Sequence, residues 1–537
     1  MGNVVLISGP ISVGKSALVN QFEKRFGARR ISTRQLLLQR NPQGDREALI
    51  KLGLELDEST SGRWVLDEFL DAARGDLEGE IWLIDAVRTL DQVQHFRQQL
   101  PGKVFHVHLT APIGVLRKRY LERPAELQEF SSYDEARLHG TEKNIDDLAT
   151  VADCILDTHK NDAASLLARA ASDLDLYPKT TERLVDVLVG AQFGSEGKGN
   201  ICAHIAKDYQ VLMRVGGPNA GHKVSFPKYD YIQLPSGTLS NPGAKLLVGA
   251  GATLSVKQVL KEVRDLKLSG ERLSIDPQAV IIEDSDIETE MGSLEAIGST
   301  KKGVGVATAR KILGRGDKVY FDSPVRLARD VPELKEYVRC TKIELEKAYL
   351  RGDRILLEGT QGTDLSIHHG YYPWVTSRET TASGCLADAG IAPARVRRVI
   401  MVTRTYPIRV GGESGPMMRE IDFATIAERS GVSEAEIRGT EVGTVSGKKR
   451  RIGEFDWEQV RRSAVLNGAT DIALTFADYI DASNKSATEY AMLTAETKKF
   501  VEDLERVTGT NVTWITKDFG EDAIVIEREG SRTENGN

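Results

Sequence analysis

Residues 184–200 read LVDVLVGAQFGSEGKGN, and this stretch decides how the larger part of the chain folds. Its first half has the composition of a buried strand and its second half that of a glycine-rich turn. Residues 201–209 continue with the apolar spacing of a helix. A helix that starts directly after such a turn presents free N–H groups and the positive end of its dipole to an anion. We therefore predict an α/β fold with a phosphate-binding loop at residues 191–200.

The overall composition is typical of a globular protein with more than one domain. The chain has 537 residues, of which 40% are hydrophobic and 28% charged, and its formal net charge is −7. This charge argues against stable nucleic-acid binding. Four scattered cysteines without metal-type spacing indicate a reducing cytoplasm, the host's if a phage encodes the chain. No apolar stretch approaches the ~20 residues of a transmembrane helix, so no membrane partner is expected.

A second glycine-rich turn, GPISVGKS, spans residues 9–16 and matches the pattern G-x-x-x-x-G-K-S. Gly9 and Gly14 shape the loop, Lys15 would reach the β- and γ-phosphates, and Ser16 would bind Mg²⁺. A chance glycine turn is the alternative. The strand before the motif and the helix after it favour the nucleotide-binding interpretation.

Further charged residues follow where a phosphoryl-transfer site would use them. Asp85 stands at a strand end that suits a Mg²⁺-linked acid, with Arg88 beside it, and Arg117, Arg119 and Arg123 share one helical segment. Clustered guanidinium groups suit transferred phosphates, although a solvated basic helix explains any one of them equally well. Taken together, residues 1–175 resemble the small P-loop kinases of nucleoside monophosphates. The sequence does not identify the acceptor of the transferred phosphoryl group.

Strand-like and helix-like segments alternate in both parts of the chain, which predicts parallel sheets covered by helices. The predicted strands are residues 3–8, 80–86, 103–110, 184–190, 245–251, 353–359, 397–410, 471–478 and 523–528, and the predicted helices include 14–26, 115–123, 161–175 and 331–352. Pro178 interrupts the alternation. We therefore predict a P-loop kinase-like domain over residues 1–178, a second α/β domain over 183–530 and a disordered tail over 531–537.

The second domain resembles adenylosuccinate synthetase, because several separate motifs occur in that family's order. These are AQFGSEGKG (191–199), GGPNAGHKV (216–224), LPSG (234–237), AIGSTKKGVG (296–305), LEGTQGTDLSIHHGYYPWVTS (357–377), YPIRVGG (406–412), VGTVSGKKRRIG (442–453) and LTFAD (474–478). The family is a carbon–nitrogen ligase. A nucleoside triphosphate phosphorylates O6 of a 6-oxopurine monophosphate, and the amine of aspartate then displaces that phosphate, with Mg²⁺ between the phosphates.

The resemblance implies a role for each matching residue. His222 would act as the acid at O6, Lys198 would contact phosphate, and Gln361 would complete the catalytic set with Ser195. The implied metal ligands are Ser195 and Gly221. The implied nucleotide-binding residues are Gly194, Glu196, Gly197, Gly199, Asn219, Gly221, Thr300, Thr376, Val410, Gly411, Arg450 and Asp478, and the implied aspartate-binding residues are Ser446, Lys448 and Arg450. An ordinary turn hydrogen bond is the alternative for each polar residue.

The sequence departs from the family pattern at Ser195, where the family has its catalytic aspartate. A serine hydroxyl does not ionise near neutral pH and cannot replace a carboxylate as the base that removes the N1 proton. It is also smaller, so it leaves room for a 2-amino group on the purine. A phage-type branch of the family that acts on dGMP shares this departure. The other interpretation is an inactive remnant, which the presence of His222, Lys198 and Gln361 disfavours.

Two further departures concern the other substrates. Lys448 stands where the family usually has arginine, and it lies near the position that reads the ribose 2′-hydroxyl. Phe476 replaces the lysine that packs over guanine in the family, whereas Asp478 is kept. ATP or dATP is therefore expected in place of GTP, although Phe476 suits plain core packing as well. The family also forms homodimers in which an arginine enters the neighbouring site, and Arg310 is the candidate here.

Together these features predict a ligase that joins L-aspartate to dGMP with ATP, fused to a nucleotide kinase domain. Two alternatives stay open. One is a conventional adenylosuccinate synthetase that uses IMP and GTP, and the other is a nucleotide-sensing protein that binds without reacting.

Overall fold

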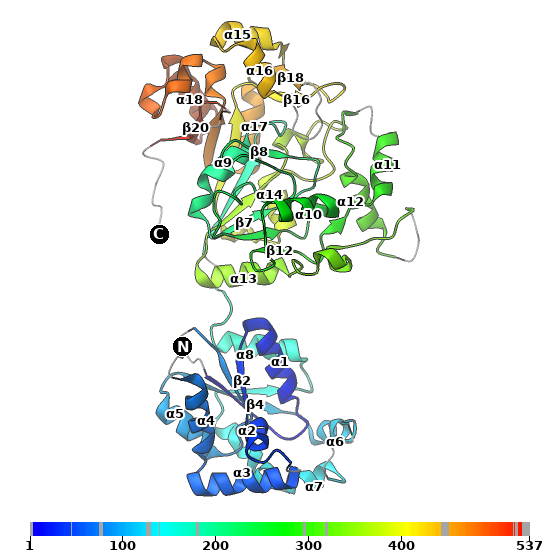
Figure 1. Ribbon diagram of the computed structural model, residues 1–537, viewed down its shortest axis with the longest axis vertical. Helices are drawn as coiled ribbons and strands as arrows, with labels where there is room; N and C mark the ends of the chain where they lie inside the picture. Colours follow the sequence, from blue (N-terminus) through cyan, green and yellow to red (C-terminus); the bar gives the residue numbers. More distant parts are fainter. Residues whose placement is uncertain are drawn as a thin grey trace. The chain divides into compact units, whose positions relative to one another are not determined.

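The computed structural model describes residues 4–43, 46–74, 79–124, 130–138, 140–178, 182–293, 297–316, 321–441, 450–518, 520 and 525–528. The chain divides into two compact units, Met1–Tyr177 and Pro178–Asn537 (Figure 1), which are described separately below. The predicted tail over 531–537, Ser446 and Lys448 lie outside the described residues.

The N-terminal unit is built on a five-stranded parallel sheet in the order β2-β3-β1-β4-β5. The strands are β1 (Val4–Ser8), β2 (Arg29–Ser32), β3 (Trp82–Asp85), β4 (Val104–Thr110) and β5 (Cys154–Asp157). The helices are α1 (Lys15–Phe26), α2 (Thr33–Arg40), α3 (Arg46–Thr60), α4 (Trp64–Ala73), α5 (Leu90–Gln99), α6 (Ile113–Leu121), α7 (Tyr133–Leu138) and α8 (Ala163–Asp173), and η2 (Gly140–Val151) is a 3₁₀ helix.

Alternation along the central strand β1 builds two cores in this unit. Val5 and Ile7 face one side, where α1 and α8 pack, and Val4 and Leu6 face the other, where α4 and α5 pack. Phe22 of α1 is fully buried in the first core. Because both faces are covered, β1 is buried along its whole length and delivers its carboxyl end to the loop at residues 9–14.

The C-terminal unit is built on a nine-stranded sheet in the order β12-β10-β7-β14-β6-β15-β19-β20-β21, parallel except for the last pair. The strands are β6 (Val185–Gly190), β7 (Val211–Arg214), β10 (Lys245–Val248), β12 (Leu273–Ile275), β14 (Ile355–Glu358), β15 (Val396–Arg404), β19 (Asp471–Thr475), β20 (Asn511–Thr516) and β21 (Val525–Glu527). The opening stretch of the sequence therefore forms the strand in the middle of this sheet, with the phosphate-binding loop at its carboxyl end.

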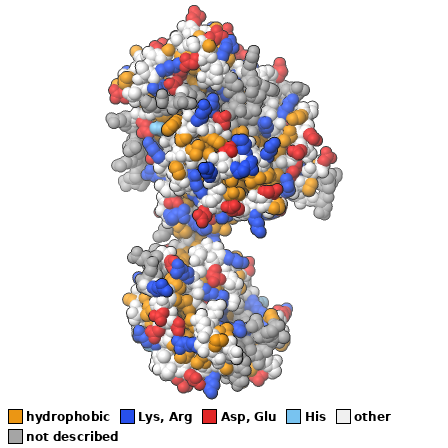
Figure 2. Space-filling view, viewed as in Figure 1, with side chains coloured by type: hydrophobic (Ala, Val, Ile, Leu, Met, Phe, Trp, Pro, Cys, Tyr) orange, Lys and Arg blue, Asp and Glu red, His pale blue; other side chains and the backbone are white. Residues whose placement is uncertain are grey.

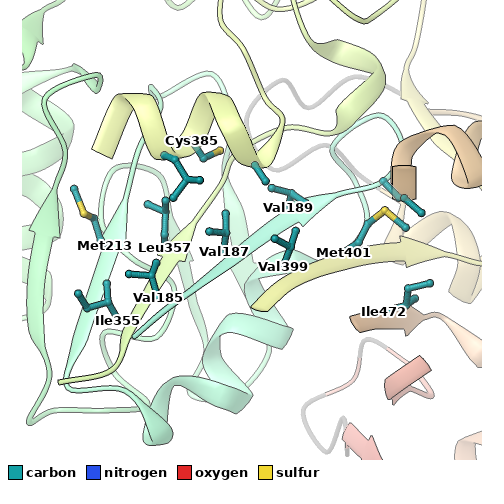
Figure 3. Close-up of a cluster of buried hydrophobic side chains, with 14 of the residues drawn as sticks. Val185, Val187, Val189, Met213, Ile355, Leu357, Cys385, Val399, Met401 and Ile472 are labelled. Atoms are coloured by element: carbon teal, nitrogen blue, oxygen red, sulfur yellow. The ribbon is translucent and has the colours of Figure 1, made fainter. Parts of the chain in front are cut away.

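The helices of this unit are α9 (Lys198–Ile205), α10 (Val256–Asp265), α11 (Asp284–Ser293), α12 (Val304–Leu313), α13 (Thr341–Arg351), α14 (Ala382–Ala389), α15 (Phe423–Ser430), α16 (Glu434–Thr440), α17 (Trp457–Asn467) and α18 (Ala495–Thr508). Helices cover both faces of the large sheet, whereas α15 and α16 pack on a smaller sheet beside it. Figure 3 shows the larger core, in which Val185, Val187 and Val189 of β6 lie with Leu357 of β14 beneath Cys385 of α14. The α/β fold class predicted for the two parts is confirmed by these two sheets.

Short strands form three small sheets beside the large one. They are β8 (His222–Val224) with β9 (Tyr229–Tyr231), β11 (Thr253–Leu254) with β13 (Val280–Ile281), and β16 (Ile408–Val410) and β17 (Glu420–Ile421) on either side of β18 (Arg450–Gly453). The last of these packs with α15, α16 and the ring of Phe476 into a separate apolar cluster.

Two predicted elements are wrong in extent. The helix predicted over 331–352 begins only at Thr341, because the backbone of Tyr337 and Arg339 bonds to Ile275 at the edge strand β12. The strand predicted over 397–410 is two strands, since β15 ends at Arg404 and β16 belongs to another sheet. Both errors arise because tertiary pairing overrides local pattern.

The surface carries both signs of charge. Figure 2 shows acidic and basic side chains interspersed over the visible face of each unit. Across the described part of the chain, no helix has the length and apolar character needed to cross a bilayer.

Asp186 is a buried carboxylate at the second position of β6. It accepts hydrogen bonds from the Tyr209 hydroxyl at 2.6 Å and from Nε of Arg397 at 2.9 Å, and its side chain is fully buried. Asp186→Ala leaves both donors without their acceptor. We expect it to lower the free energy of unfolding of the C-terminal unit by about 3 kcal/mol, measured by chemical denaturation. Asp186→Asn keeps one acceptor oxygen and should cost clearly less; equal losses in the two variants would contradict this role.

Candidate active site

Both glycine-rich loops end in the same local structure. Gly14 and Gly197 adopt the left-handed conformation, at φ 103° and 84°, and each is followed by a helix whose first residue is lysine, Lys15 and Lys198 respectively. Glycine is required at this position because a side chain would be strained at positive φ. Each unit therefore places a helix N-terminus and a lysine at the carboxyl end of its central strand.

The loop of the C-terminal unit opens into a cavity of about 500 Å³. Most of the predicted ligase residues lie in its wall, namely Gly194, Ser195, Gly197, Lys198, Gly199, Asn219, Gly221, His222, Thr300, Gln361, Thr376, Val410 and Arg450. Phe476 lines it as well. Three predicted residues are not in the wall: Glu196, Gly411 and Asp478.

Glu196 has a role inside the loop. Its carboxylate is fully buried and accepts hydrogen bonds from the backbone N–H groups of Gln192 at 3.0 Å and Gly194 at 2.8 Å, and from Nζ of Lys198 at 2.7 Å. The prediction that Glu196 contacts the nucleotide is therefore wrong for this geometry, because both oxygens are used to hold the loop in shape.

His222 is held by a buried carboxylate that the sequence analysis did not identify. Its Nδ1 donates to Glu358, which also accepts from the Ser236 hydroxyl at 2.5 Å and from Arg214 at 3.2 Å. Burial alone would raise the pKa of Glu358, but Arg214, His222 and Ser236 outweigh it and lower that pKa. Burial lowers the pKa of His222, and Arg214 lowers it further. The imidazole is therefore neutral at pH 7, with its proton on Nδ1.

Nε2 of His222 is then a proton acceptor at the cavity, which differs from the predicted acid at O6, because this nitrogen must first gain a proton before it can donate one. It is buried and has no hydrogen-bond partner among the described residues. Oδ1 of Asn219 is likewise buried and has no hydrogen-bond partner among the described residues. Orphaned buried polar atoms are costly, so two of them in one cavity wall indicate a polar ligand that satisfies both.

Three predicted residues meet at one hydroxyl. Oγ1 of Thr376 accepts from the side-chain amides of Asn219 at 3.2 Å and Gln361 at 3.4 Å. Gln361 sits at φ 59°, and the loop packs closely on it, because a Cβ on Gly194 would lie 3.1 Å from the Gln361 Cα. The structure thus brings together residues from three distant motifs.

The two departures at Ser195 and Phe476 are joined by one buried side chain, Arg404. Its Nη1 donates to the carbonyl of Ser195 at 3.0 Å, and its guanidinium lies 4.0 Å from the centre of the Phe476 ring. Glu441 pairs with both Arg404 and Arg450. Arg404 and Glu441 were not predicted, because arginine in a strand and glutamate after a helix carry no motif.

The donor set fits a magnesium ion that is bound mainly through phosphates. The Ser195 hydroxyl and the Gly221 main chain lie at the cavity, and oxygen donors of this kind suit Mg²⁺. Among the described residues there is no cluster of three His, Cys, Asp or Glu side chains that could hold a metal alone.

Arg310 does not have the role predicted for it. Its guanidinium is 1% exposed, pairs with both oxygens of Asp286 and donates to the carbonyls of Ile281 and Pro324. An arginine fixed in this way cannot extend into a neighbouring subunit. The homodimer stays a prediction, without Arg310 as its contact.

The family profile described as Adenylosuccinate synthetase matches residues 187–321 and 325–486. The chain belongs to the adenylosuccinate synthetase family. Its C-terminal unit is accordingly a carbon–nitrogen ligase of that type, which joins aspartate to a purine nucleotide at the expense of a nucleoside triphosphate.

Relatives agree with this assignment. The adenylosuccinate synthetase of Archaeoglobus fulgidus is 39% identical over 338 residues, which cover 62% of this chain and 94% of that protein. A solved structure titled cyanophage S-2L succinoaminodeoxyadenylate synthetase bound to dGMP and dATP is 28% identical, with a TM-score of 0.53, over 64% of this chain and 95% of that one. Fully ligated adenylosuccinate synthetase from Plasmodium falciparum, 21% identical, shares the fold with a TM-score of 0.55 over 64% of this chain and 100% of that one.

The loop of the N-terminal unit opens into a second cavity, of about 530 Å³. Its lining includes Gly14, Lys15, Ser16, Asp85, Arg88, Arg119 and Arg123, whose roles stay predictions, whereas the exposed Arg117 pairs with Asp134. Gly9 lies behind the wall, where its carbonyl accepts from Nζ of Lys15 at 2.6 Å. Asp85 pairs with Arg30, so it is not a free metal ligand in this structure.

Asp478 lies behind Phe476 as a buried acid. Burial raises the pKa of Asp478 to about 8, and its Oδ1 has no partner among the described residues. Between pH 3.8 and about 8 the folded protein therefore binds a proton that the unfolded chain has lost. The contribution of Asp478 to the free energy of unfolding consequently decreases as the pH rises from 3.8 to about 8.

Asp478→Asn removes this titration and tests its sign. The free energy of unfolding of the variant minus that of the wild type should increase with pH, by up to ~1.4 kcal/mol per pH unit, and level off above about pH 8. Denaturant unfolding at several pH values measures it. A difference that is constant from pH 5 to pH 9 would show that Asp478 is ionised in the folded protein.

Proposed function

We propose that the C-terminal unit joins L-aspartate to C6 of dGMP, with ATP or dATP as the phosphoryl donor. The observation that carries this proposal is Ser195. It lines the cavity half-buried in the loop where the family pattern has an aspartate, and its side chain makes no hydrogen bond to any described residue. The cyanophage structure of similar fold was solved with dGMP and dATP, which supports the same choice of substrates.

A 2-amino purine suits the site for a steric and an electrostatic reason. A carboxylate beside C2 would crowd an amino group, whereas a hydroxyl leaves space and accepts a hydrogen bond from it. Conversely, a purine without the 2-amino group leaves the Ser195 hydroxyl unsatisfied. Discrimination of this kind follows from unpaired polar groups in a buried site.

The residues of the cavity supply the proton chemistry. The purine passes its N1 proton to Nε2 of His222, O6 attacks the γ-phosphorus with loss of the nucleoside diphosphate, and the amine of aspartate then displaces phosphate from C6. Because Glu358 holds Nδ1 of His222, Nε2 is the atom that exchanges a proton with the purine. When bound, Mg²⁺ would neutralise charge on the phosphates. Phe476 lines the cavity with an uncharged side chain, one face of which packs on Arg404, and this suits an adenine base better than the family's lysine does.

Ser195→Asp tests the substrate choice. We expect dGMP turnover to fall at least 10-fold and IMP turnover to rise, because the carboxylate fills the space of the 2-amino group and restores a base. Product formation from dGMP or IMP with aspartate and ATP is followed by mass spectrometry. Ser195→Ala is the matched control, since it keeps the space and should retain dGMP turnover better than Ser195→Asp.

Other outcomes would select the alternatives. A wild-type protein that consumes IMP with GTP and ignores dGMP is a conventional synthetase. Tight nucleotide binding without phosphate release would mark a nucleotide-sensing protein. Either result overturns the proposal.

We further propose that the N-terminal unit is a phosphotransferase. Its support is the P-loop geometry: Nζ of Lys15 is held by two carbonyls, of Gly9 at 2.6 Å and Pro10 at 2.9 Å, and arginines line the same cavity. Carbonyl oxygens are weak partners for a lysine, so a phosphate can replace them.

Substituting Lys15 or Lys198 one at a time separates phosphoryl transfer from aspartate ligation. Lys15→Ala should abolish phosphoryl transfer to a nucleotide acceptor and leave ligation unchanged. Lys198→Met should do the reverse, because each lysine starts the helix of its own loop. Separate assays of nucleoside diphosphate formation and of aspartate ligation measure the two effects, and loss of both activities in either variant would contradict independent sites.

A further inference from the structure

The N-terminal cavity contains a polar cluster that phosphate binding does not use. Asp57 of α3 accepts hydrogen bonds from the indole N–H of Trp64 at 2.7 Å and from the side-chain amide of Gln92 at 2.9 Å. All three side chains line the cavity. Both bonds end on the same oxygen, Oδ1. Within the described residues no hydrogen bond ends on the second oxygen, Oδ2, so it can accept from a ligand.

Gln92 is fixed beside it as a donor. Its Oε1 accepts from the backbone N–H of Arg88 at 2.7 Å, so its amide nitrogen must be the atom that faces Asp57. The side chain is 2% exposed and cannot turn. One of its two N–H bonds points to Asp57, and the other remains for a ligand. The cavity thus offers an N–H donor next to a carboxylate acceptor, in a fixed arrangement.

The wall around this pair is apolar. It is formed by Leu37 of α2, by Leu49, Ile50 and Leu54 of α3, and by the Trp64 ring. A flat heterocycle fills such a space and removes it from water. A sugar or hydroxy acid would bury hydroxyl groups against these side chains without partners.

The anionic end of the acceptor has its own partners. Arg30, Arg34 and Arg88 line the cavity, in addition to Arg119, which donates to the P-loop carbonyl of Val13 at 3.4 Å. Glu142 connects the two ends, because it accepts from the backbone N–H of Ile11 at 3.0 Å and pairs with Arg88. The loop that would bind the donor phosphates and an arginine that would bind the acceptor are therefore held by one buried carboxylate.

We propose that this cavity binds a 6-aminopurine deoxynucleoside monophosphate as phosphoryl acceptor, and that Asp57 recognises its amino group. The inference rests on the proposed phosphotransferase activity. The 6-amino group donates to Oδ2 of Asp57, and ring N1 accepts from Gln92. A phosphate oxygen of the acceptor attacks the γ-phosphorus of a nucleoside triphosphate. The bond from that phosphorus to the β–γ bridging oxygen breaks, and the nucleoside diphosphate leaves.

This assignment places the two units in one reaction sequence. The ligase replaces a 6-oxo group by an aspartate nitrogen, and an elimination reaction that removes the four-carbon acid would leave a 6-amino group. The N-terminal site would then phosphorylate that product. In this pose a 6-oxopurine would place an oxygen against the Asp57 carboxylate and an N1–H against the Gln92 N–H, and neither pair can form a hydrogen bond. The N-terminal site would therefore not phosphorylate dGMP, the proposed substrate of the ligase.

The test compares acceptors on the full chain with ATP. The acceptors are dAMP, the 2-aminoadenine deoxynucleoside monophosphate, dGMP and dTMP, and nucleoside diphosphate formation is measured. The wild type should prefer the two 6-aminopurines by at least 10-fold in kcat/KM.

Asp57→Asn keeps Oδ1 for Trp64 and Gln92 but puts a donor in place of Oδ2, so kcat/KM for the 6-aminopurines should fall about 10- to 100-fold. ATP binding, measured by calorimetry, should be unchanged. Asp67→Asn, an exposed carboxylate on the next helix, is the matched control and should change nothing.

The outcomes separate the two proposals. If the wild type phosphorylates none of the acceptors, the phosphotransferase proposal fails. If it phosphorylates dTMP or dGMP as well as the 6-aminopurines, the phosphotransferase stands and the acceptor assignment is overturned. An unchanged acceptor ranking in a folded, ATP-binding Asp57→Asn variant would overturn the role of Asp57. Should that variant not fold, the acceptor ranking of the wild type still decides the substrate class.

Discussion

The buried carboxylate of Glu358 is the interaction on which the ligase site depends. It stands at the carboxyl end of β14, next to the central strand, and it receives hydrogen bonds from β7 through Arg214, from β8 through His222 and from the segment of Ser236. A charge in the protein interior is tolerated only when it is paired and fully hydrogen-bonded. The need to satisfy this one carboxylate therefore fixes the position of three chain segments and the proton state of the histidine that meets the substrate.

The two phosphate-binding loops show how similar local structure can carry different electrostatics. In the first, Lys15 is held by main-chain carbonyls, and in the second, Lys198 is held by the Glu196 carboxylate. The first lysine lies near the Glu142 carboxylate and lowers its pKa, but its printed hydrogen bonds go to neutral oxygens that a phosphate can replace. The second is already neutralised, so much of the binding of an anion there must come from the helix N-terminus and from other residues of the cavity. The shared glycine–lysine sequence would not reveal this difference.

Much of the fold could be predicted from the sequence, because the central strands are continuous apolar runs and both loops carry explicit motifs. The wall of the ligase cavity was also largely predictable, since thirteen of the residues named from the family motifs line it. What could not be predicted were partners distant in sequence. Glu358 holds His222 across 136 positions, and Arg404 reaches Ser195 across 209. Glu196 and Arg310 were misassigned because a motif gives the residue but not the direction of its side chain.

The contact of Arg404 with both Ser195 and Phe476 has a consequence for how such a protein could arise. Two of the three positions at which the sequence leaves the family pattern lie next to one buried guanidinium, which is itself held by Glu441. Arg404 bonds to the main chain at position 195 and packs on the ring at position 476, so a change of the ring would shift the arginine and with it the loop at position 195. The two substitutions would thus be epistatic. A lineage that moved from one purine substrate to another would therefore pass more easily by changing the nucleotide donor as well.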